Sequence, residues 1–221
     1  MLHLNKIKGV IFDLDGILVD TEVYQWQGWV EVLKPLGIGL SKEEYFKYAG
    51  KTGNIIESEL AKDYNLKIEK GSLLKQKEKL LIEWFHSREL KLLPYAKEAV
   101  DFFINKGMKV AIASGGPKDE IILKLKKINL YSLFSVITSS SEVKRGKPFP
   151  DIYLLSAERL GLKPEECLAF EDTQYGLEAA KSAGFTCFAI PGEFSVKQDF
   201  SRADKIFNNL EEVIKFYKVS S

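Results

Sequence analysis

Short runs of hydrophobic residues recur along the chain, and segments with helical periodicity separate them. Four runs are too continuous for half-exposed strands and suit parallel strands buried on both faces: Val10–Phe12, Val110–Ala113, Leu168–Phe170 and Cys187–Ile190. A weaker run, Phe134–Thr138, predicts a fifth strand. Between the runs, apolar residues such as Ile121, Leu125 and Ile128 recur at helical spacing. Strands that alternate with helices predict an α/β fold with a Rossmann-like, open parallel sheet.

One long segment interrupts this alternation of strands and helices. Residues 21–93 show helical periodicity, with Glu and Lys throughout, and contain no convincing strand. We interpret the segment as a small helical cap domain that is inserted after the first strand. The predicted core domain then consists of residues 1–20 and 94–221.

Local signals predict where several helices begin and end. Gly37–Gly39 should end the first helix of the insert, and Ser41 with Glu44 has the spacing of a capping box for the next helix. Pro94 would be the first residue of the helix that restarts the core. Asp151 follows two prolines and is placed to cap a later helix.

Composition and charge narrow the class of ligand. The chain has 32 Lys and Arg against 31 Asp and Glu, so it lacks the positive charge of a protein that binds nucleic acid or an anionic membrane. No run approaches the roughly 18 apolar residues of a membrane span. Cys167 and Cys187 are too few for a disulfide framework and lie in predicted strands. We therefore expect a cytoplasmic monomer with a small ligand.

Acidic pairs follow two of the predicted strands. Asp13 and Asp15 come directly after the first strand, and Glu171 and Asp172 follow the strand at 168–170 in the same way. An Asp-Gly pair is also common in turns, so the first pair alone would be explained by a plain turn. Two strand ends that present carboxylates to the same edge, where open α/β sheets bind ligands, favour a functional site.

Carboxylates in this number suit Mg²⁺, which prefers hard oxygen ligands, several waters and a substrate phosphate. Zinc usually recruits His or Cys, and the two histidines, His3 and His86, stand away from every motif. Their positions also speak against a phosphatase with a histidine nucleophile and against a Ser-His-Asp hydrolase. The predicted cofactor is therefore Mg²⁺.

Two further motifs suit the oxygens of a phosphate group. Ser114 and Gly115 follow the strand at 110–113 and precede a predicted helix, whose free backbone N–H groups can hold an anion. An ordinary strand-to-helix turn would look similar. Lys147 lies in a loop that Pro148 and Pro150 stiffen. Most lysines are solvated surface charges, but a lysine in so constrained a loop suits a fixed counter-charge for the acidic groups.

Taken in chain order, these motifs resemble those of the haloacid dehalogenase superfamily. The four matching motifs are Asp13-Leu14-Asp15-Gly16, Ser114, Lys147 and Glu171-Asp172. They span essentially the whole predicted core. The stretch Phe12–Thr21, together with the helical insert, further resembles the subgroup that contains β-phosphoglucomutase and many sugar-phosphate phosphatases.

The resemblance implies a role for each motif. Asp13 would attack phosphorus and bind Mg²⁺, and Asp15 would protonate the leaving oxygen and offer its backbone carbonyl to the metal. Asp172 and Glu171 would complete the metal site. The phosphoryl oxygens would be held by Ser114, Gly115 and Lys147.

Gly50-Lys51-Thr52 matches the end of a P-loop, but Tyr45 stands where the first glycine of that motif is needed. No buried strand precedes it. We interpret the stretch as a helix turn of the insert, with Lys51 facing the cleft as a substrate-specificity contact.

The reaction type is the least constrained prediction. Asp15 disfavours dehalogenation, because attack on carbon needs no such carboxylate, and the same carboxylate disfavours a phosphonatase. The mutase of the resembled subgroup has a cap arginine where Lys51 stands and a histidine near the position of Gln25, so both departures favour a phosphatase. We predict a magnesium-dependent phosphatase acting on a small phosphomonoester, a sugar phosphate. A β-phosphoglucomutase and a non-catalytic binding protein on the same fold stay open.

Overall fold

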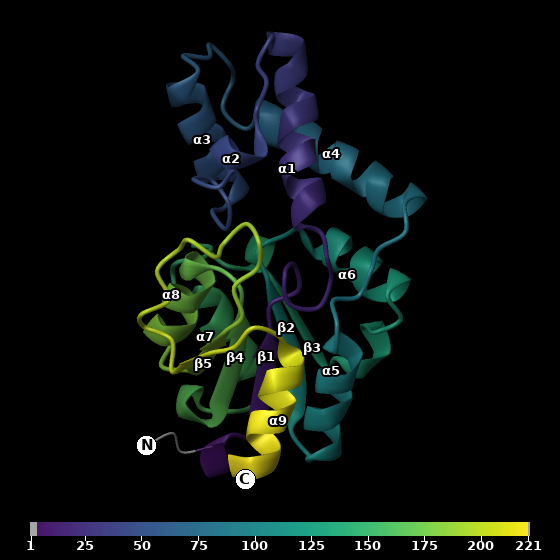
Figure 1. The fold of residues 1–221 in the computed structure, drawn as a ribbon, viewed down its shortest axis with the longest axis vertical. Coiled ribbons are helices and arrows are strands. Elements are labelled where there is room, and N and C mark those ends of the chain that lie inside the picture. The colour runs from purple at the N-terminus through teal and green to yellow at the C-terminus, as the bar shows by residue number, and fades with distance from the viewer. Residues whose placement is uncertain (1–3, 221) are drawn as a thin grey trace.

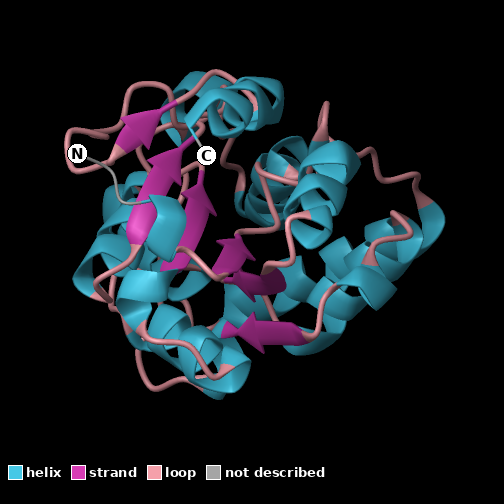
Figure 2. Ribbon diagram, turned by 90° about the horizontal axis from the view of Figure 1, so that it is seen from below, coloured by secondary structure: helices cyan, strands magenta, loops and turns pink. Residues whose placement is uncertain are grey.

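The computed structural model describes residues 4–220, which form a parallel β-sheet with helices on both faces and a group of helices beyond one end (Figure 1). The strands are β1 (Gly9–Phe12), β2 (Lys109–Ser114), β3 (Val136–Ser139), β4 (Cys167–Glu171), β5 (Thr186–Ala189) and β6 (Lys205–Ile206). They lie in the order β3-β2-β1-β4-β5-β6, and each neighbouring pair is parallel (Figure 2). The predicted α/β fold with an open parallel sheet is confirmed.

Both faces of the sheet are covered, which explains why the strands are hydrophobic throughout. One face packs against α5 (Ala96–Asn105), α6 (Lys118–Lys127) and α9 (Leu210–Ser220). The other face packs against α7 (Asp151–Leu160) and α8 (Gln174–Ser182). In β1, Val10 and Phe12 join the first of these cores, whereas Ile11 joins the second. Successive residues of one strand therefore serve opposite layers.

The strand at the edge beyond β5 was not predicted from the sequence. β6 contains only Lys205 and Ile206, and Ile206 is 55% exposed, so it lacks the continuous apolar run that marks the buried strands. The predicted strand at 134–138 also begins later, at Val136, because Phe134 packs into the core just before the strand starts.

The segment predicted as an insert is helical and stands beyond the carboxyl ends of the strands (Figure 1). Its helices are α1 (Glu22–Leu33), α2 (Lys42–Tyr45), α3 (Gly53–Asp63) and α4 (Ser72–Ser87). They enclose a hydrophobic cluster of their own, which includes Trp29, Tyr48 and Leu60 and which Phe194 joins from the sheet side. We call residues 21–93 the helical segment. That it forms a separate domain stays a prediction.

The two connections between the helical segment and the sheet run beside each other. The Asp20 N–H donates to the Lys91 carbonyl at 3.0 Å, and the Leu93 N–H donates to the Leu18 carbonyl at 3.0 Å. The chain therefore leaves and rejoins the sheet at one place, next to the end of β1.

Some of the predicted helix ends are confirmed and others are wrong. Gly37 ends the first helical stretch with φ 76°, and the Ser41–Glu44 capping box is present, so both predictions are confirmed. The prediction for Pro94 was wrong, because α5 begins at Ala96 after a turn that is closed by a hydrogen bond from the Ala96 N–H to the Leu93 carbonyl. Asp151 was also misassigned as a cap.

Asp151 is instead the first residue of α7, and its carboxylate makes no capping hydrogen bond. Arg145 binds both oxygens of this carboxylate at 3.2 and 2.9 Å, so the pair closes the loop that carries Lys147. Cys167 and Cys187 are buried in β4 and β5, as predicted. Among residues 4–220, no helix has both the length and the apolar character needed to cross a membrane.

Candidate active site

Three carboxylates meet at the carboxyl ends of β1 and β4, which are neighbours in the sheet. Asp13 directly follows β1, and its N–H donates to the Phe170 carbonyl of β4 at 3.0 Å. Glu171 ends β4 and Asp172 follows it. One oxygen from each of Asp13, Glu171 and Asp172 lies within 4.8 Å of the others. The strand pairing thus brings two acidic motifs together that are more than 150 residues apart in sequence.

The three carboxylates fit a hard divalent cation. All are buried, and burial raises the pKa of Asp13 to about 7 and that of Asp172 well above its ordinary value, because a charged carboxylate is poorly solvated there. The backbone of the first motif packs closely against Asp172, because a Cβ added to Gly16 would lie 2.0 Å from an oxygen of the Asp172 carboxylate. A bound cation would stabilise the charged forms, and oxygen ligands alone suit Mg²⁺ better than zinc.

Lys147 reaches this cluster from the loop before α7. Its Nζ donates to Asp13 Oδ1 at 2.8 Å, to Glu171 Oε1 at 2.5 Å and to the Ala113 carbonyl at 3.1 Å. The side chain is 9% exposed, so all three ammonium hydrogens have protein partners in a largely dry environment. Lys147 is thus a fixed positive charge next to Asp13, as the sequence predicted from its loop.

Glu171 differs from the other two carboxylates. It is fully buried and is not among the residues that line the cavity. Its Oε1 accepts hydrogen bonds from Lys147 and from the hydroxyl of Tyr153, a residue of α7 that sequence reasoning did not identify. Glu171 therefore holds Lys147 in place, whereas Asp13 and Asp172 face the cavity.

The predicted phosphate-binding residues lie on the same edge of the sheet. Ser114 ends β2, next to β1, and Gly115 follows it; both line the cavity with Lys147. Hydroxyl groups of the neighbouring loop hold this turn, since Ser140 Oγ donates to the Gly115 carbonyl and Ser139 Oγ to the Gly116 carbonyl, each at 2.6 Å. The turn leads into α6, as the sequence predicted.

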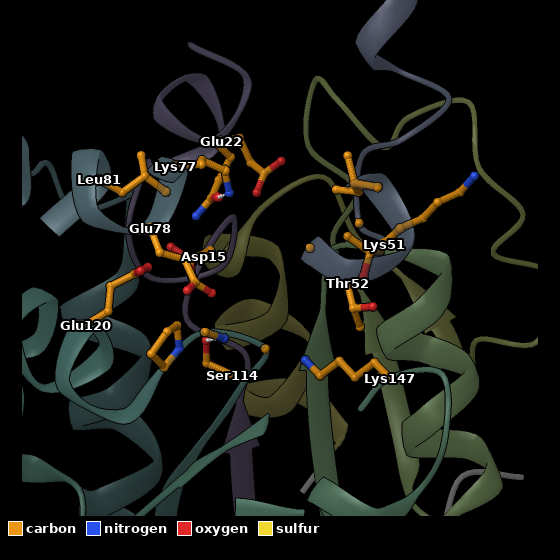
Figure 3. A pocket seen from close by; sticks show the side chains of 18 of the residues that line it. Asp15, Glu22, Lys51, Thr52, Lys77, Glu78, Leu81, Ser114, Glu120 and Lys147 are labelled. Atoms are coloured by element: carbon orange, nitrogen blue, oxygen red, sulfur yellow. Dashed lines mark hydrogen bonds between the residues drawn. The ribbon is translucent and has the colours of Figure 1, made fainter. Parts of the chain in front are cut away.

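Asp15 points into the cavity on the side of α6 (Figure 3). Its Oδ1 accepts hydrogen bonds from the Thr21 hydroxyl and from Lys124 Nζ, the latter at 2.6 Å. Lys124 is completely buried and also pairs with Glu120 at 2.5 Å. Sequence reasoning missed both residues of this pair. Both of these hydrogen bonds reach Oδ1 of Asp15.

The cavity has a volume of about 160 Å³ and lies between the sheet edge and the helical segment. The helical segment contributes several charged residues to its lining: Glu22, Lys51, Lys77 and Glu78. Lys51 thus belongs to the lining, but its ammonium group is paired with Glu59, and its role as a specificity contact stays a prediction. His86 is exposed near the end of α4 and does not line the cavity, and His3 lies outside the described residues.

Lys77 is the most enclosed of these charged groups. Its Nζ donates to Gln25 Oε1 at 2.5 Å and lies 5.2 Å from the centre of the Trp29 ring. Burial lowers the pKa of Lys77 to about 8, and the nearby Glu120 opposes this shift. Figure 3 shows Lys77 beside Glu22, on the opposite side of the cavity from Lys147.

Comparison with known proteins assigns the chain to a family. The model of the haloacid dehalogenase-like hydrolase family matches residues 10–190, which include all four motifs. The chain belongs to this family. The resemblance seen in the motifs is thereby confirmed, and with it the prediction of an enzyme of the hydrolase class.

Several relatives are similar over most of their length. A phosphorylated carbohydrates phosphatase of Thermotoga maritima is 34% identical over 183 residues, 80% of this chain and 82% of the relative. CbbY of Rhodobacter capsulatus is 34% identical over 212 residues, 90% of this chain and 92% of the relative. The structure of a CbbY mutant from Rhodobacter sphaeroides in complex with xylulose-(1,5)bisphosphate has a TM-score of 0.83 and 25% identity, and covers 93% of this chain and 96% of that one.

Proposed function

We propose that this protein is a magnesium-dependent phosphatase that hydrolyses a sugar phosphate through an aspartyl-phosphate on Asp13. The observation that carries the proposal is the position of Asp13 in the cavity lining. Lys147 donates a hydrogen bond to Asp13, and Asp172 and Ser114 line the same cavity. A carboxylate nucleophile, a fixed cation and a hydroxyl donor then face the same space. The T. maritima relative, named for phosphorylated carbohydrates, supports the substrate class.

In the first step, a carboxylate oxygen of Asp13 attacks phosphorus and the bond from phosphorus to the sugar oxygen breaks. Lys147 Nζ and the Ser114 hydroxyl bind phosphoryl oxygens and stabilise their charge, which grows in the transition state. Glu171 keeps Lys147 in position by accepting its hydrogen bond, and the buried hydroxyl of Tyr153 donates a hydrogen bond that fixes Glu171. The product of this step is the aspartyl-phosphate and the free sugar.

Asp15 transfers the protons of both steps. Its Oδ2 protonates the departing sugar oxygen in the first step and removes a proton from water in the second, so that hydroxide attacks phosphorus and frees Asp13. Thr21 and Lys124 hold the other oxygen of Asp15, which orients the carboxyl group toward the cavity. A positioned acid or base of this kind contributes about 10²–10⁴-fold to the rate.

Asp13 and Asp172, with Glu171 and the Asp15 backbone carbonyl, would hold Mg²⁺. The ion would supply positive charge for the phosphoryl oxygens beyond that of Lys147. The helical segment would act as a cap that closes over the substrate and excludes water during attack by Asp13.

The direct test is phosphate release from p-nitrophenyl phosphate and from a panel of sugar phosphates, with Mg²⁺ present or chelated. We expect magnesium-dependent turnover that Asp13→Asn abolishes. The matched control is Asp119→Asn, which makes the same change at an exposed position of α6 outside the cavity lining and should leave the rate unchanged. Full activity of Asp13→Asn would refute the covalent mechanism.

A further inference from the structure

The positive charges that line the cavity are not all free to bind the anionic groups of a phosphorylated substrate. Three lysines line it, Lys51, Lys77 and Lys147, and each already has a hydrogen-bond partner in the protein. Lys147 is bound to Asp13 and Glu171, on the side where the transferring phosphoryl group would lie. Any second anionic group of a substrate would therefore depend on Lys51 or Lys77.

Lys51 is neutralised within the helical segment. Its Nζ lies 2.8 Å from one oxygen of Glu59 and 2.6 Å from the other. Figure 3 shows the Lys51 side chain extending away from Lys147 and Ser114, so the ammonium group is turned toward Glu59 and not toward the phosphoryl end of the cavity. A second phosphate would have to displace Glu59 to gain this charge.

Lys77 is surrounded by carboxylates. Glu22, Glu78 and Glu120 also line the cavity, and the charges of all three act to raise the pKa of Lys77. Glu120 is paired with the buried Lys124, so the single charge of Lys77 faces Glu78 and also Glu22, whose pKa burial and the charge of Asp15 raise to about 7. A phosphate or carboxylate placed here would meet like charges, and such juxtapositions cost several kcal/mol.

We propose that the cavity selects monophosphates whose remaining part is uncharged and rich in hydroxyl groups, and that it rejects substrates with a second phosphate or a carboxylate. Glu22 and Glu78 offer oxygens that accept hydrogen bonds from sugar hydroxyls, and Lys77 and Gln25 offer donors. This inference rests on the proposed phosphatase function and narrows its substrate. It separates this chain from the relative whose structure holds a bisphosphate.

Matched substrate pairs test the inference, because the members of each pair differ by one anionic group. The first pair is glucose 6-phosphate and glucose 1,6-bisphosphate, and the second is sorbitol 6-phosphate and 6-phosphogluconate. Initial rates of phosphate release in excess Mg²⁺ give kcat/KM for each. We expect the doubly anionic member of each pair to be at least about tenfold poorer.

A variant then links the discrimination to Lys51. Glu59→Gln removes the charge that neutralises Lys51 without shortening the side chain, so kcat/KM for the bisphosphate should rise relative to the monophosphate, by about fivefold or more. Glu83→Gln makes the same substitution on an exposed position of α4 outside the cavity lining and should leave the ratio unchanged.

The outcomes separate this inference from the proposed function. Magnesium-dependent turnover with equal kcat/KM for both members of each pair would keep the phosphatase and overturn the selection against anions. An unchanged bisphosphate ratio in Glu59→Gln would overturn the role of the Lys51–Glu59 pair. Absence of turnover on every substrate, p-nitrophenyl phosphate included, would contradict the phosphatase itself.

Discussion

Replacing Lys147 by Met separates the two functions that the structure gives this residue. Methionine fills much of the space of the lysine stem but has no charge and no donor. The substitution leaves Asp13 and Glu171 without the ammonium that lies 2.8 and 2.5 Å from them. It also leaves the Ala113 carbonyl without its donor at 3.1 Å.

The expected effects differ for stability and for catalysis. Removing one partner of a buried ion pair usually costs about 3–5 kcal/mol, and Lys147 is only 9% exposed, so little solvent screening reduces this value. For a chain of 221 residues, a loss of that size lowers Tm by roughly 6–20 °C. Catalysis should lose about 10²–10³-fold in kcat, as when one donor to a developing oxyanion is deleted.

The metal affinity should change in the opposite direction. Without the ammonium, no neighbouring positive charge repels Mg²⁺ or offsets the charge of the carboxylates, so Lys147→Met should bind Mg²⁺ more tightly while turning over more slowly. Calorimetric unfolding with and without Mg²⁺, together with phosphate-release kinetics, measures all three quantities. A variant with unchanged Tm and kcat would refute the reasoning, because Lys147 would then be a solvated surface charge.

Four further predictions follow from the same geometry. Asp13→Asn should lose at least about 10³-fold in kcat while its circular dichroism stays native, because the nucleophile is removed without a change in volume; residual activity within tenfold would contradict the covalent step. Tyr153→Phe should lower kcat by about 3–10-fold, because Glu171 loses a buried hydrogen bond but keeps Lys147, and an unchanged rate would show that Tyr153 has no part in holding this group. Chelation should stop turnover, with Mg²⁺ restoring it and Ca²⁺ failing, since Ca²⁺ prefers more ligands at longer distances; turnover that survives exhaustive chelation would exclude the metal site. In metal-free protein, burial raises the pKa of Asp13 from its ordinary 3.8 to about 7, so this group binds a proton more tightly in the folded state than in the unfolded state. The free energy of unfolding of the wild type, taken relative to Asp13→Asn, should therefore fall as the pH rises from 4 to 7; urea titrations in which this difference rises would contradict the burial effect.

The sheet and its acidic edge could be predicted from the sequence because the signals are local. A strand that is buried on both faces must be hydrophobic at every position, so β1, β2, β4 and β5 are visible as short runs. The carboxylates come directly after such runs, and parallel pairing then fixes that Asp13 and Asp172 lie at the same edge. β6 escaped prediction because two residues, one of them half exposed, leave no pattern.

The residues that support the carboxylates could not be predicted in the same way. Tyr153 looks like any core aromatic of an amphipathic helix, and only the packing of α7 on the sheet brings its hydroxyl to Glu171. The sequence contains a weak indication of Glu120 and Lys124. They are oppositely charged residues four positions apart, and each precedes a buried apolar residue of α6, Ile121 or Leu125. That signal identifies a buried ion pair but not its contact with Asp15, which is 109 residues away in sequence.

The placement of Lys124 has a consequence for how the helical segment influences catalysis. Its ammonium binds Asp15 on one side and lies 4.6 Å from the centre of the Phe85 ring of α4 on the other. The proposed acid–base carboxylate is thus held by a residue of α6 that itself packs against the helical segment. A movement of α4 relative to α6 would change the surroundings of Lys124 and, through it, the orientation of Asp15. Proton transfer to the leaving oxygen is therefore a step of the proposed mechanism that depends on the position of α4 relative to α6.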